Sequence, residues 1–169
     1  MSTTALVWFR RDLRLIDNLA LLAAAAEADT IIPVYIHAPE EESPWQPGAA
    51  SNWWLHHSLN ALAKSLTAAG APLLIRSGNT AATLLELIEA TGADSVYWNR
   101  LYEPAVIQRD AQVRHSLEDH GILTKDFNAY LLLEPGSVMN KSAAPYKVFT
   151  PFWKGGRSTQ GAGDPDCLG

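Results

Sequence analysis

Short apolar runs alternate with longer segments of mixed polarity through most of the chain. The runs are continuous and bounded by polar residues, a pattern typical of strands that are buried on both faces of a parallel sheet. Five runs predict strands, the last of them the weakest: residues 5–9, Thr30–His37, Pro72–Arg76, Ser95–Asn99 and a segment within 123–133.

The intervening segments place apolar residues at helical spacing and carry capping signals. Asp17 or Asn18 is the expected cap of a helix over Leu19–Glu27. Three further helices are expected between a start signal and an end signal: Ser51 and Gly70, Asn79 and Gly92, and Pro104 and Gly121. Strands that alternate with helices of this length predict an α/β fold. We expect a Rossmann-like five-stranded parallel sheet with helices on both faces.

Two segments interrupt this alternation. Residues 39–50 contain three prolines and three consecutive glutamates, which predict a surface loop. Residues 155–169 are rich in glycine and have no apolar periodicity, which predicts a disordered tail and resembles a truncation or a cloning remnant. We therefore expect one domain over residues 1–154.

Composition narrows the class of protein. The chain is 47% hydrophobic and carries a formal net charge of −5, which argues against a protein that binds nucleic acid by itself. No apolar stretch approaches the ~20 residues that span a bilayer, and the first residues do not resemble a signal peptide. The single cysteine, Cys167, cannot form an internal disulfide. These features predict a cytoplasmic protein without a membrane partner.

In an open parallel sheet, ligands bind beyond the carboxyl ends of the strands. The residues at these ends offer donors, a carboxylate and an aromatic ring, enough to orient a planar ligand with polar edges. They are Arg10, Arg11 and Asp12, then His37, then Ser77 and Gly78, then Asn99, Arg100, Tyr102 and Glu103. The chain has neither the dinucleotide-binding glycine fingerprint nor a P-loop.

A structural role is the alternative for several of these side chains. The charged residues after the first strand can form an ion-pair network, in which we expect Asp12 to pair with Arg10 or Arg14. His56 and His57 are adjacent, a spacing unsuited to a metal pair, so we expect no metal site. We expect Trp8 and Trp98 to lie in the core, and Trp53, Trp54 and Trp153 to contact a ligand or another domain. We find no convincing catalytic Ser-His-Asp or Cys-His set in the sequence.

Four segments together resemble the photolyase/cryptochrome family. The segment from Trp8 to Asn18 is similar to the opening signature of the family, and the segment from Ser51 to Leu59 to a later helix, with Asn52 in place of an arginine. Residues 97–104 and 145–154 resemble two further family segments. The resemblance covers residues 4–154.

The resemblance implies a division of labour along the full-length protein. The amino-terminal α/β domain of the family holds an antenna chromophore, and a following helical domain holds the catalytic FAD and binds damaged DNA. This chain is thus expected to be the antenna-chromophore-binding domain of a light-dependent deoxyribodipyrimidine photolyase, a DNA repair lyase, inactive alone and without FAD. We expect the missing helical domain as its partner, damaged DNA as a partner of the full-length protein only, and self-association of the fragment through Phe149, Phe152 and Trp153.

The resemblance also implies a set of ligand-binding residues. We expect the antenna chromophore to contact Phe9, Arg10, Arg11, His37, Trp53, Asn99, Arg100, Tyr102 and Glu103. Flavin mononucleotide (FMN), a deazaflavin and a folate are the three candidates. The folate pattern has a carboxylate where this chain has Val106, and the deazaflavin pattern has an acidic residue at Leu101, so a flavin or an empty cleft is favoured.

Two other functions are compatible with parts of the pattern. One is the amino-terminal domain of a cryptochrome blue-light photoreceptor, whose deciding residues would lie outside this chain. The other is an unrelated Rossmann-like nucleotide-binding module, such as an electron-transfer flavoprotein or stress-protein domain. Such a module has a glycine-rich phosphate loop late in the chain, and Gly136-Ser137 is a poor match to it.

Overall fold

A computed structural model of the chain describes residues 2–44 and 46–160, with side chains described through Arg157. Two compact units divide the chain, Met1–Ala129 and Tyr130–Gly169. The first unit contains β1 (Thr4–Phe9), α1 (Leu19–Glu27), β2 (Thr30–His37), the 3-10 helix η1 (Pro39–Glu42), α2 (Ala49–Ala68), β3 (Leu74–Ser77), α3 (Thr80–Thr91), β4 (Ser95–Asn99), α4 (Pro104–Asp119) and β5 (Leu123–Phe127). The second unit contains α5 (Phe149–Gln160).

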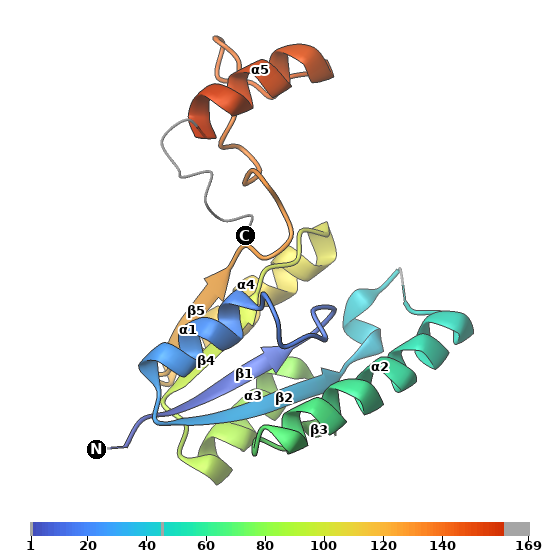
Figure 1. Cartoon of the computed structure of the whole chain (residues 1–169), viewed down its shortest axis with the longest axis vertical. Helices are drawn as coiled ribbons and strands as arrows, with labels where there is room; N and C mark the ends of the chain where they lie inside the picture. The colour runs from blue at the N-terminus through green and yellow to red at the C-terminus, as the bar shows by residue number, and fades with distance from the viewer. Residues whose placement is uncertain (1, 45, 161–169) are drawn as a thin grey trace. The chain divides into compact units, whose positions relative to one another are not determined.

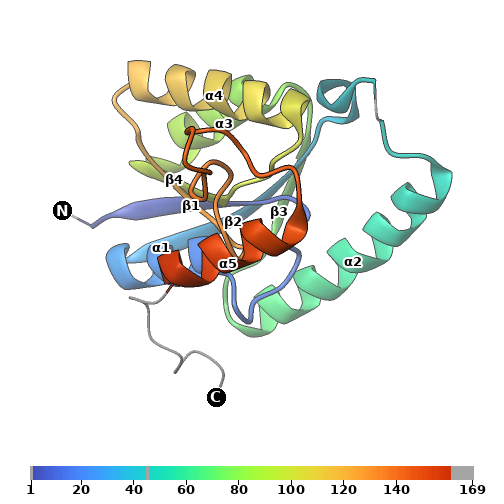
Figure 2. The same cartoon turned by 90° about the horizontal axis from the view of Figure 1, so that it is seen from above.

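The first unit is built on a five-stranded sheet of order β3-β2-β1-β4-β5 (Figure 1). Every pairing in it is parallel. Helices α1 and α2 cover one face of the sheet, and α3 and α4 cover the other (Figure 2). The predicted α/β fold with helices on both faces is therefore confirmed. Because chain order reverses at β1, the carboxyl ends of the central strands are left open to a ligand.

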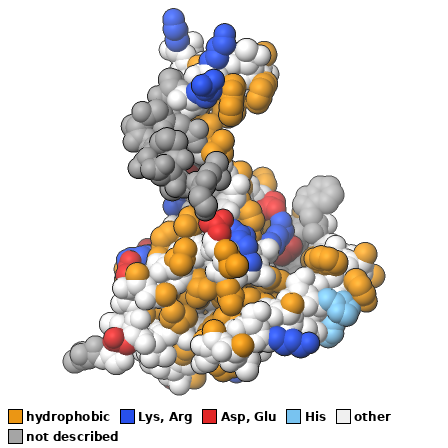
Figure 3. Space-filling model, in the orientation of Figure 1, with side chains coloured by type: hydrophobic (Ala, Val, Ile, Leu, Met, Phe, Trp, Pro, Cys, Tyr) orange, Lys and Arg blue, Asp and Glu red, His pale blue; other side chains and the backbone are white. Residues whose placement is uncertain are grey.

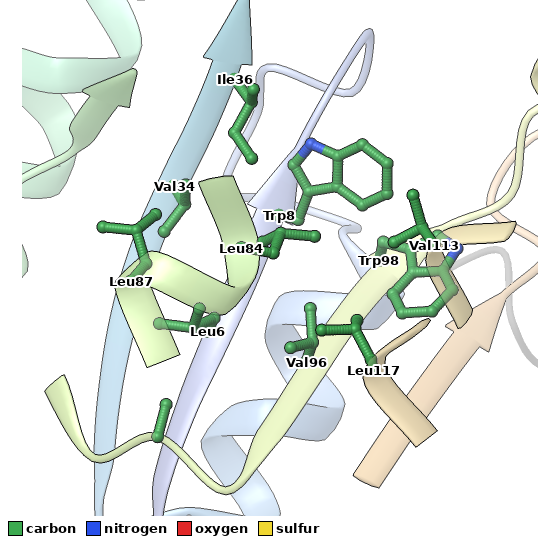
Figure 4. Close-up of a cluster of buried hydrophobic side chains, with 11 residues drawn as sticks. Leu6, Trp8, Val34, Ile36, Leu84, Leu87, Val96, Trp98, Val113 and Leu117 are labelled. Atoms are coloured by element: carbon green, nitrogen blue, oxygen red, sulfur yellow. The ribbon is translucent and has the colours of Figure 1, made fainter. Parts of the chain in front are cut away.

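Two apolar cores lie on the two faces of the sheet. Alternate residues of β1 point to opposite sides, so that Leu6 and Trp8 pack under α3 and α4 while Val7 and Phe9 pack under α1 and α2. Figure 4 shows the first of these clusters, in which Trp8 and Trp98 lie together, with ring centroids 5.9 Å apart. Both tryptophans are buried, as predicted.

Two element boundaries differ from the prediction. Helix α2 begins at Ala49, with Gly48 as its N-cap, so Ser51 lies within the first turn and caps nothing. The amide of Asn52 supports this turn by donating to the carbonyl of Pro47 at 3.3 Å. Strand β3 begins two residues late, at Leu74, where pairing with β2 starts, because Pro72 has no N–H to donate. None of the described helices combines the length and the apolarity needed to cross a bilayer.

In the second unit, α5 continues through the glycine pair that the sequence assigned to a disordered tail. Gly156 is buried, and a Cβ atom there would lie 2.8 Å from Cδ1 of Leu133. The glycines therefore allow the helix to approach the preceding loop closely, which is why residues 155–160 are helical despite their composition. The rest of the predicted tail, residues 161–169, lies outside the described part of the chain, and its disorder stays a prediction.

Candidate functional site

A buried polar network supports the turn after β1. The carboxylate of Asp12, which is 3% exposed, accepts from the backbone N–H of Arg10 at 2.8 Å and from the amide of Asn99 at 2.5 Å. The Asn18 amide lies 3.4 Å from the same carboxylate, and its oxygen accepts from the N–H of Leu21, which caps α1. The network joins the ends of β1 and β4 to the start of α1.

The arginines that were expected to pair with Asp12 have other partners. Arg10 donates to the carboxylate of Asp110 on α4 at 2.5 Å and to the carbonyl of Asn99. Arg14 donates to the carbonyl of Asp17 at 2.9 Å. The predicted ion pair of Asp12 is thus wrong, because its carboxylate accepts hydrogen bonds from a backbone N–H and from asparagine amides instead. Burial, the largest influence, lowers the pKa of Arg10, while Asp110 opposes the shift.

Arg11 bridges two carboxylates across the end of β1. Its guanidinium contacts Glu42 of η1 at 3.2 Å and Glu103, which precedes α4. Burial works against the charged form of Arg11, but the two carboxylates prevail and raise its pKa. Arg11 therefore ties η1 to the N-terminus of α4, although all three side chains are partly exposed and the pairs are screened by solvent.

A cavity of about 760 Å³ lies beyond the carboxyl ends of β1 and β2. Its size falls within the range of small-molecule and cofactor sites, roughly 300–1,000 Å³. The wall combines apolar and aromatic side chains with arginines. Its residues are Trp8, Arg10, Arg11, Leu13, Arg14, Tyr35, Ile36, Glu42, Pro47, Ala50, Ser51, Trp54, Leu55, Ser58 and Arg109.

Some polar groups of the residues that line the cavity have no charged or hydrogen-bonded partner in the described part of the chain. The indole N–H of buried Trp8 has no hydrogen-bond partner among the described residues. Arg14 forms no ion pair with any described carboxylate, in contrast to Arg10, Arg11 and Arg109. The first turn of α2 also lines the cavity and has no side-chain cap. An arginine and an uncapped helix N-terminus both favour an anionic group on a ligand.

Tyr35 contributes a neutral hydroxyl to the same wall. Burial raises its pKa to about 12, and the nearby carboxylate of Glu42 adds to the shift. The phenol therefore keeps its proton at neutral pH and can donate a hydrogen bond to a ligand. A planar, partly polar molecule with a negatively charged group fits this combination of side chains.

The predicted ligand residues separate into four groups in the structure. Arg10 and Arg11 line the cavity, and Glu103 pairs with Arg11. His37 lines a small adjoining hollow. Phe9 and Asn99 are buried in the core and in the polar network. The remaining three are not among the cavity residues: Trp53, Arg100, which pairs with Asp126, and Tyr102. Contact of any of the nine with a chromophore stays a prediction.

Sequence reasoning missed Arg109, Tyr35 and Glu42, which come from three different elements, α4, β2 and η1. No local signal joins them, since only the fold brings them together. A signal did exist on α2, where Ser51, Trp54, Leu55 and Ser58 follow the i, i+3, i+4, i+7 spacing of one helix face. That face lines the cavity.

The neighbouring face of α2 carries a different aromatic group. Trp53 is 63% exposed and its ring lies 4.3 Å from that of His57. Figure 3 shows the histidines of α2 beside apolar side chains at the surface of this helix. The adjacent tryptophans of the motif therefore differ in position, since Trp54 lines the cavity and Trp53 does not.

Comparison with known proteins gives consistent results. A family model described as DNA photolyase matches residues 5–166. The deoxyribodipyrimidine photo-lyase of Agrobacterium fabrum is 47% identical over 97% of this chain and 33% of its own length. Cryptochrome-2 of Arabidopsis thaliana is 43% identical over 91% of this chain and 25% of its own length. The chain thus spans a third or less of these two relatives, and the family match extends past residue 154, where we placed the domain boundary.

Solved structures show the same similarity. A bacterial class III photolyase from Agrobacterium tumefaciens superposes with a TM-score of 0.85 at 44% identity, covering 98% of this chain and 33% of that one. An archaeal photolyase from Sulfolobus tokodaii, described as containing two FAD molecules, gives a TM-score of 0.72 at 31% identity, covering 90% of this chain and 34% of that one. In each case the present chain corresponds to about a third of the larger protein.

Proposed function

Because the chain belongs to the DNA photolyase family, we propose that it forms the antenna domain of a light-dependent deoxyribodipyrimidine photolyase and holds a light-harvesting chromophore. The observation that carries this proposal is the 760 Å³ cavity at the carboxyl edge of the sheet. It is large enough for a fused-ring chromophore, and its wall supplies the aromatic, hydrogen-bonding and cationic groups that such a molecule needs.

A flavin nucleotide suits the cavity best among the three candidates. Trp54 and Tyr35 offer aromatic surface for a planar ring, and the hydroxyl of Tyr35 offers a hydrogen-bond donor. Arg14 and the N-terminus of α2 suit a phosphate. A second FAD, proposed as a light-harvesting cofactor in the Sulfolobus tokodaii photolyase, supports a flavin in this role.

The residues that distinguish the other two chromophores support the same choice. Val106 and Leu101 stand where the folate and deazaflavin patterns have acidic residues, and both are buried apolar side chains. Neither belongs to the cavity wall. A ligand that depends on a carboxylate at either position would therefore lose its partner here.

The bound chromophore would absorb light and pass the excitation on, while the chain positions it. The arginines and the α2 N-terminus would hold its anionic group, and the aromatic wall would fix its plane and exclude water. Repair of pyrimidine dimers, catalytic FAD and contact with damaged DNA are assigned to the rest of the full-length protein, since this chain spans about a third of its relatives.

The outer surface of the first unit offers a docking site for that remainder. Apolar side chains gather over α1, which is apolar around most of its circumference (Figure 3). Ile16, just before this helix, is 86% exposed, and Leu19 and Leu22 are exposed as well. An apolar helix face of this kind is normally covered. We propose that the helical FAD domain covers it.

Titration with FMN tests the antenna assignment, with the fluorescence anisotropy of FMN as the readout. We expect saturable micromolar binding that weakens about tenfold or more in Arg14→Gln, which loses a charged contact, and in Trp54→Ala, which loses ring contact. Trp53→Ala is the matched control, because this neighbouring tryptophan lies off the cavity and its loss should leave binding unchanged. Absence of binding by FMN, a deazaflavin and a folate at millimolar concentration, with the fold intact, would overturn the proposal.

A cryptochrome photoreceptor is the second candidate, because plant cryptochromes are also similar, at 42–44% identity. The two functions differ in the activity of the complete protein. A full-length protein that splits pyrimidine dimers under blue light is a photolyase. A full-length protein that binds FAD and changes conformation in light without repairing DNA is a photoreceptor.

A further inference from the structure

Two guanidinium groups lie against the ring of Trp8. The Cζ atom of Arg10 is 4.7 Å from the ring centroid and that of Arg109 is 5.2 Å from it. Both arginine side chains are mostly buried, 5% and 12% exposed. Asp110 accepts from both guanidiniums, at 2.5 Å and 2.8 Å, and so fixes them beside the indole. Both distances lie within the range of cation–π contacts, about 6 Å or less.

Trp8 is also part of the cavity wall, together with the same two arginines. Its indole N–H has no acceptor among the described residues. Behind it lies Trp98, whose ring in turn has the Cζ atom of Arg114 at 5.1 Å (Figure 4 shows the two tryptophans). An oxidisable pair of indoles thus connects the cavity to the core.

We propose that Arg10 and Arg109 suppress electron transfer from Trp8 to a photoexcited chromophore in the cavity. This inference depends on the proposed antenna function. An excited flavin accepts an electron readily from a neighbouring indole. In that step one electron leaves the ring of Trp8, which becomes a radical cation, and the chromophore gains the electron. Return of the electron to Trp8 restores both molecules and dissipates the excitation as heat, so the energy is lost to the antenna.

The contacts around Trp8 oppose this step in two ways. A cation near the ring face is attracted by the electron-rich indole and repelled by an indole that has lost an electron, so each guanidinium favours the unoxidised ring. The carboxylates of Asp110 and Glu41 offset part of this charge, and removal of one guanidinium leaves them less compensated. A tryptophan radical cation is further stabilised when its N–H passes a proton to a base, and no described residue accepts from this N–H. These contacts therefore oppose quenching of the chromophore by Trp8.

Trp54 and Tyr35 are the other oxidisable rings in the wall, so the test includes a Trp54→Phe background, which removes quenching by that indole. Tyr35 needs a control of its own. Its phenol holds its proton tightly, because burial raises its pKa to about 12 with a further contribution from Glu42. A phenol is oxidised most readily with loss of this proton, and Glu42 is the carboxylate near it. A Tyr35→Phe variant therefore serves as a control for quenching by the phenol.

A double-mutant cycle on Trp8 and Arg109 tests the inference, with FMN as the probe. The fluorescence lifetime of bound FMN is measured in the wild type, Trp8→Phe, Arg109→Gln and the double variant, and again in the Trp54→Phe background. We expect equal lifetimes in the wild type and in Trp8→Phe, at least about a twofold shortening in Arg109→Gln, and recovery in the double variant. Arg109→Lys keeps the charge and should retain most of the wild-type lifetime. Tyr35→Phe should not lengthen the lifetime.

The outcomes separate this inference from the antenna assignment. Anisotropy reports whether FMN is bound, and circular dichroism reports whether each variant is folded. Bound FMN whose lifetime lengthens in Trp8→Phe, or does not shorten in Arg109→Gln, overturns the protective role and leaves the antenna proposal intact. If the anisotropy does not rise in the wild type, the antenna proposal fails and the protective role fails with it.

Discussion

At the scale of single residues, Asp12 shows how a charged side chain in a sequence motif can have a mainly structural role. Its carboxylate accepts from the N–H of Arg10 and from the amides of Asn18 and Asn99, all of them buried. The side chain thereby holds the turn that presents Arg11 and Arg14 to the cavity. The motif contributes to the site through this turn as well as through its arginines.

Replacement of Asp12 by alanine should lower the free energy of unfolding by about 2–3 kcal/mol, because buried donors lose their acceptor. The measurement is the urea midpoint at constant m-value. Asp119→Ala is the matched control, since Asp119 is largely exposed and pairs only with exposed His115 among the described residues. Equal midpoints in the two variants would show that the network is solvated.

Tyr35 predicts a loss of stability at alkaline pH. Its pKa is raised to about 12 in the folded state, against an ordinary value of about 10. A raised pKa means that the folded state binds the proton more tightly, so this stabilisation is complete below about pH 10 and is lost as pH rises through 12. We expect Tyr35→Phe to remove about 1–2 kcal/mol of this alkaline decline, measured by thermal unfolding from pH 8 to 12.

The residual alkaline decline in that variant has an identified source. Tyr97 also has a pKa raised to about 12, by burial and then by its hydrogen bond to Glu27. It should continue to titrate in Tyr35→Phe. An unchanged alkaline decline in Tyr35→Phe would assign the whole effect to Tyr97 and place Tyr35 in contact with solvent.

Among the secondary-structure elements, η1 has a role that its position in a predicted loop did not indicate. Glu41 accepts from the backbone N–H of Thr80 at 2.7 Å and from its hydroxyl at 2.6 Å. Glu41 therefore caps the N-terminus of α3 from outside that helix, and Asn79 provides the local cap. The neighbouring Glu42 faces the cavity, so η1 connects α3 to the site.

Removal of this contact should destabilise the first unit. We expect Glu41→Ala to lower the free energy of unfolding by about 1–2 kcal/mol, because the amide at the start of α3 loses a charged acceptor. The comparison is Glu40→Ala in the same turn, where exposed Gln46 is the one side-chain partner of the carboxylate among the described residues. Urea denaturation of the two variants side by side is the measurement, and a smaller effect for Glu41 than for Glu40 would contradict the assignment.

At the scale of the whole molecule, exposed aromatic surface on α5 predicts self-association of the isolated chain. Phe149 is 70% exposed and Trp153 is 41% exposed, with their rings 6.1 Å apart, while Phe152 on the same helix is half-buried. Sedimentation velocity should show a concentration-dependent increase in mass that is reduced in Trp153→Ser. A strictly monomeric chain at high concentration would contradict this prediction.

Much of the fold was determined by the sequence itself. Periodicity predicted five parallel strands and the four helices between them, most clearly for β1, β2 and β4, whose apolar runs are largely buried, whereas the edge strands β3 and β5 are more exposed. Local chemistry also determined caps such as Asn18 and Asn79. The photolyase-like segments predicted the family, which the comparisons show. All of these signals lie within a few consecutive residues.

The composition of the cavity was decided only by the tertiary structure. Arg109 is far from Tyr35 and Glu42 in the chain, and the three meet because β2, η1 and α4 converge at one edge of the sheet. The choice of partner for Asp12 was likewise decided by packing, since Asp110 on α4 takes Arg10 and leaves Asp12 to the amides. Glycines 155 and 156 show the same principle, because a close contact outweighs their low helix propensity. Contacts between distant segments leave no local pattern from which they could have been predicted.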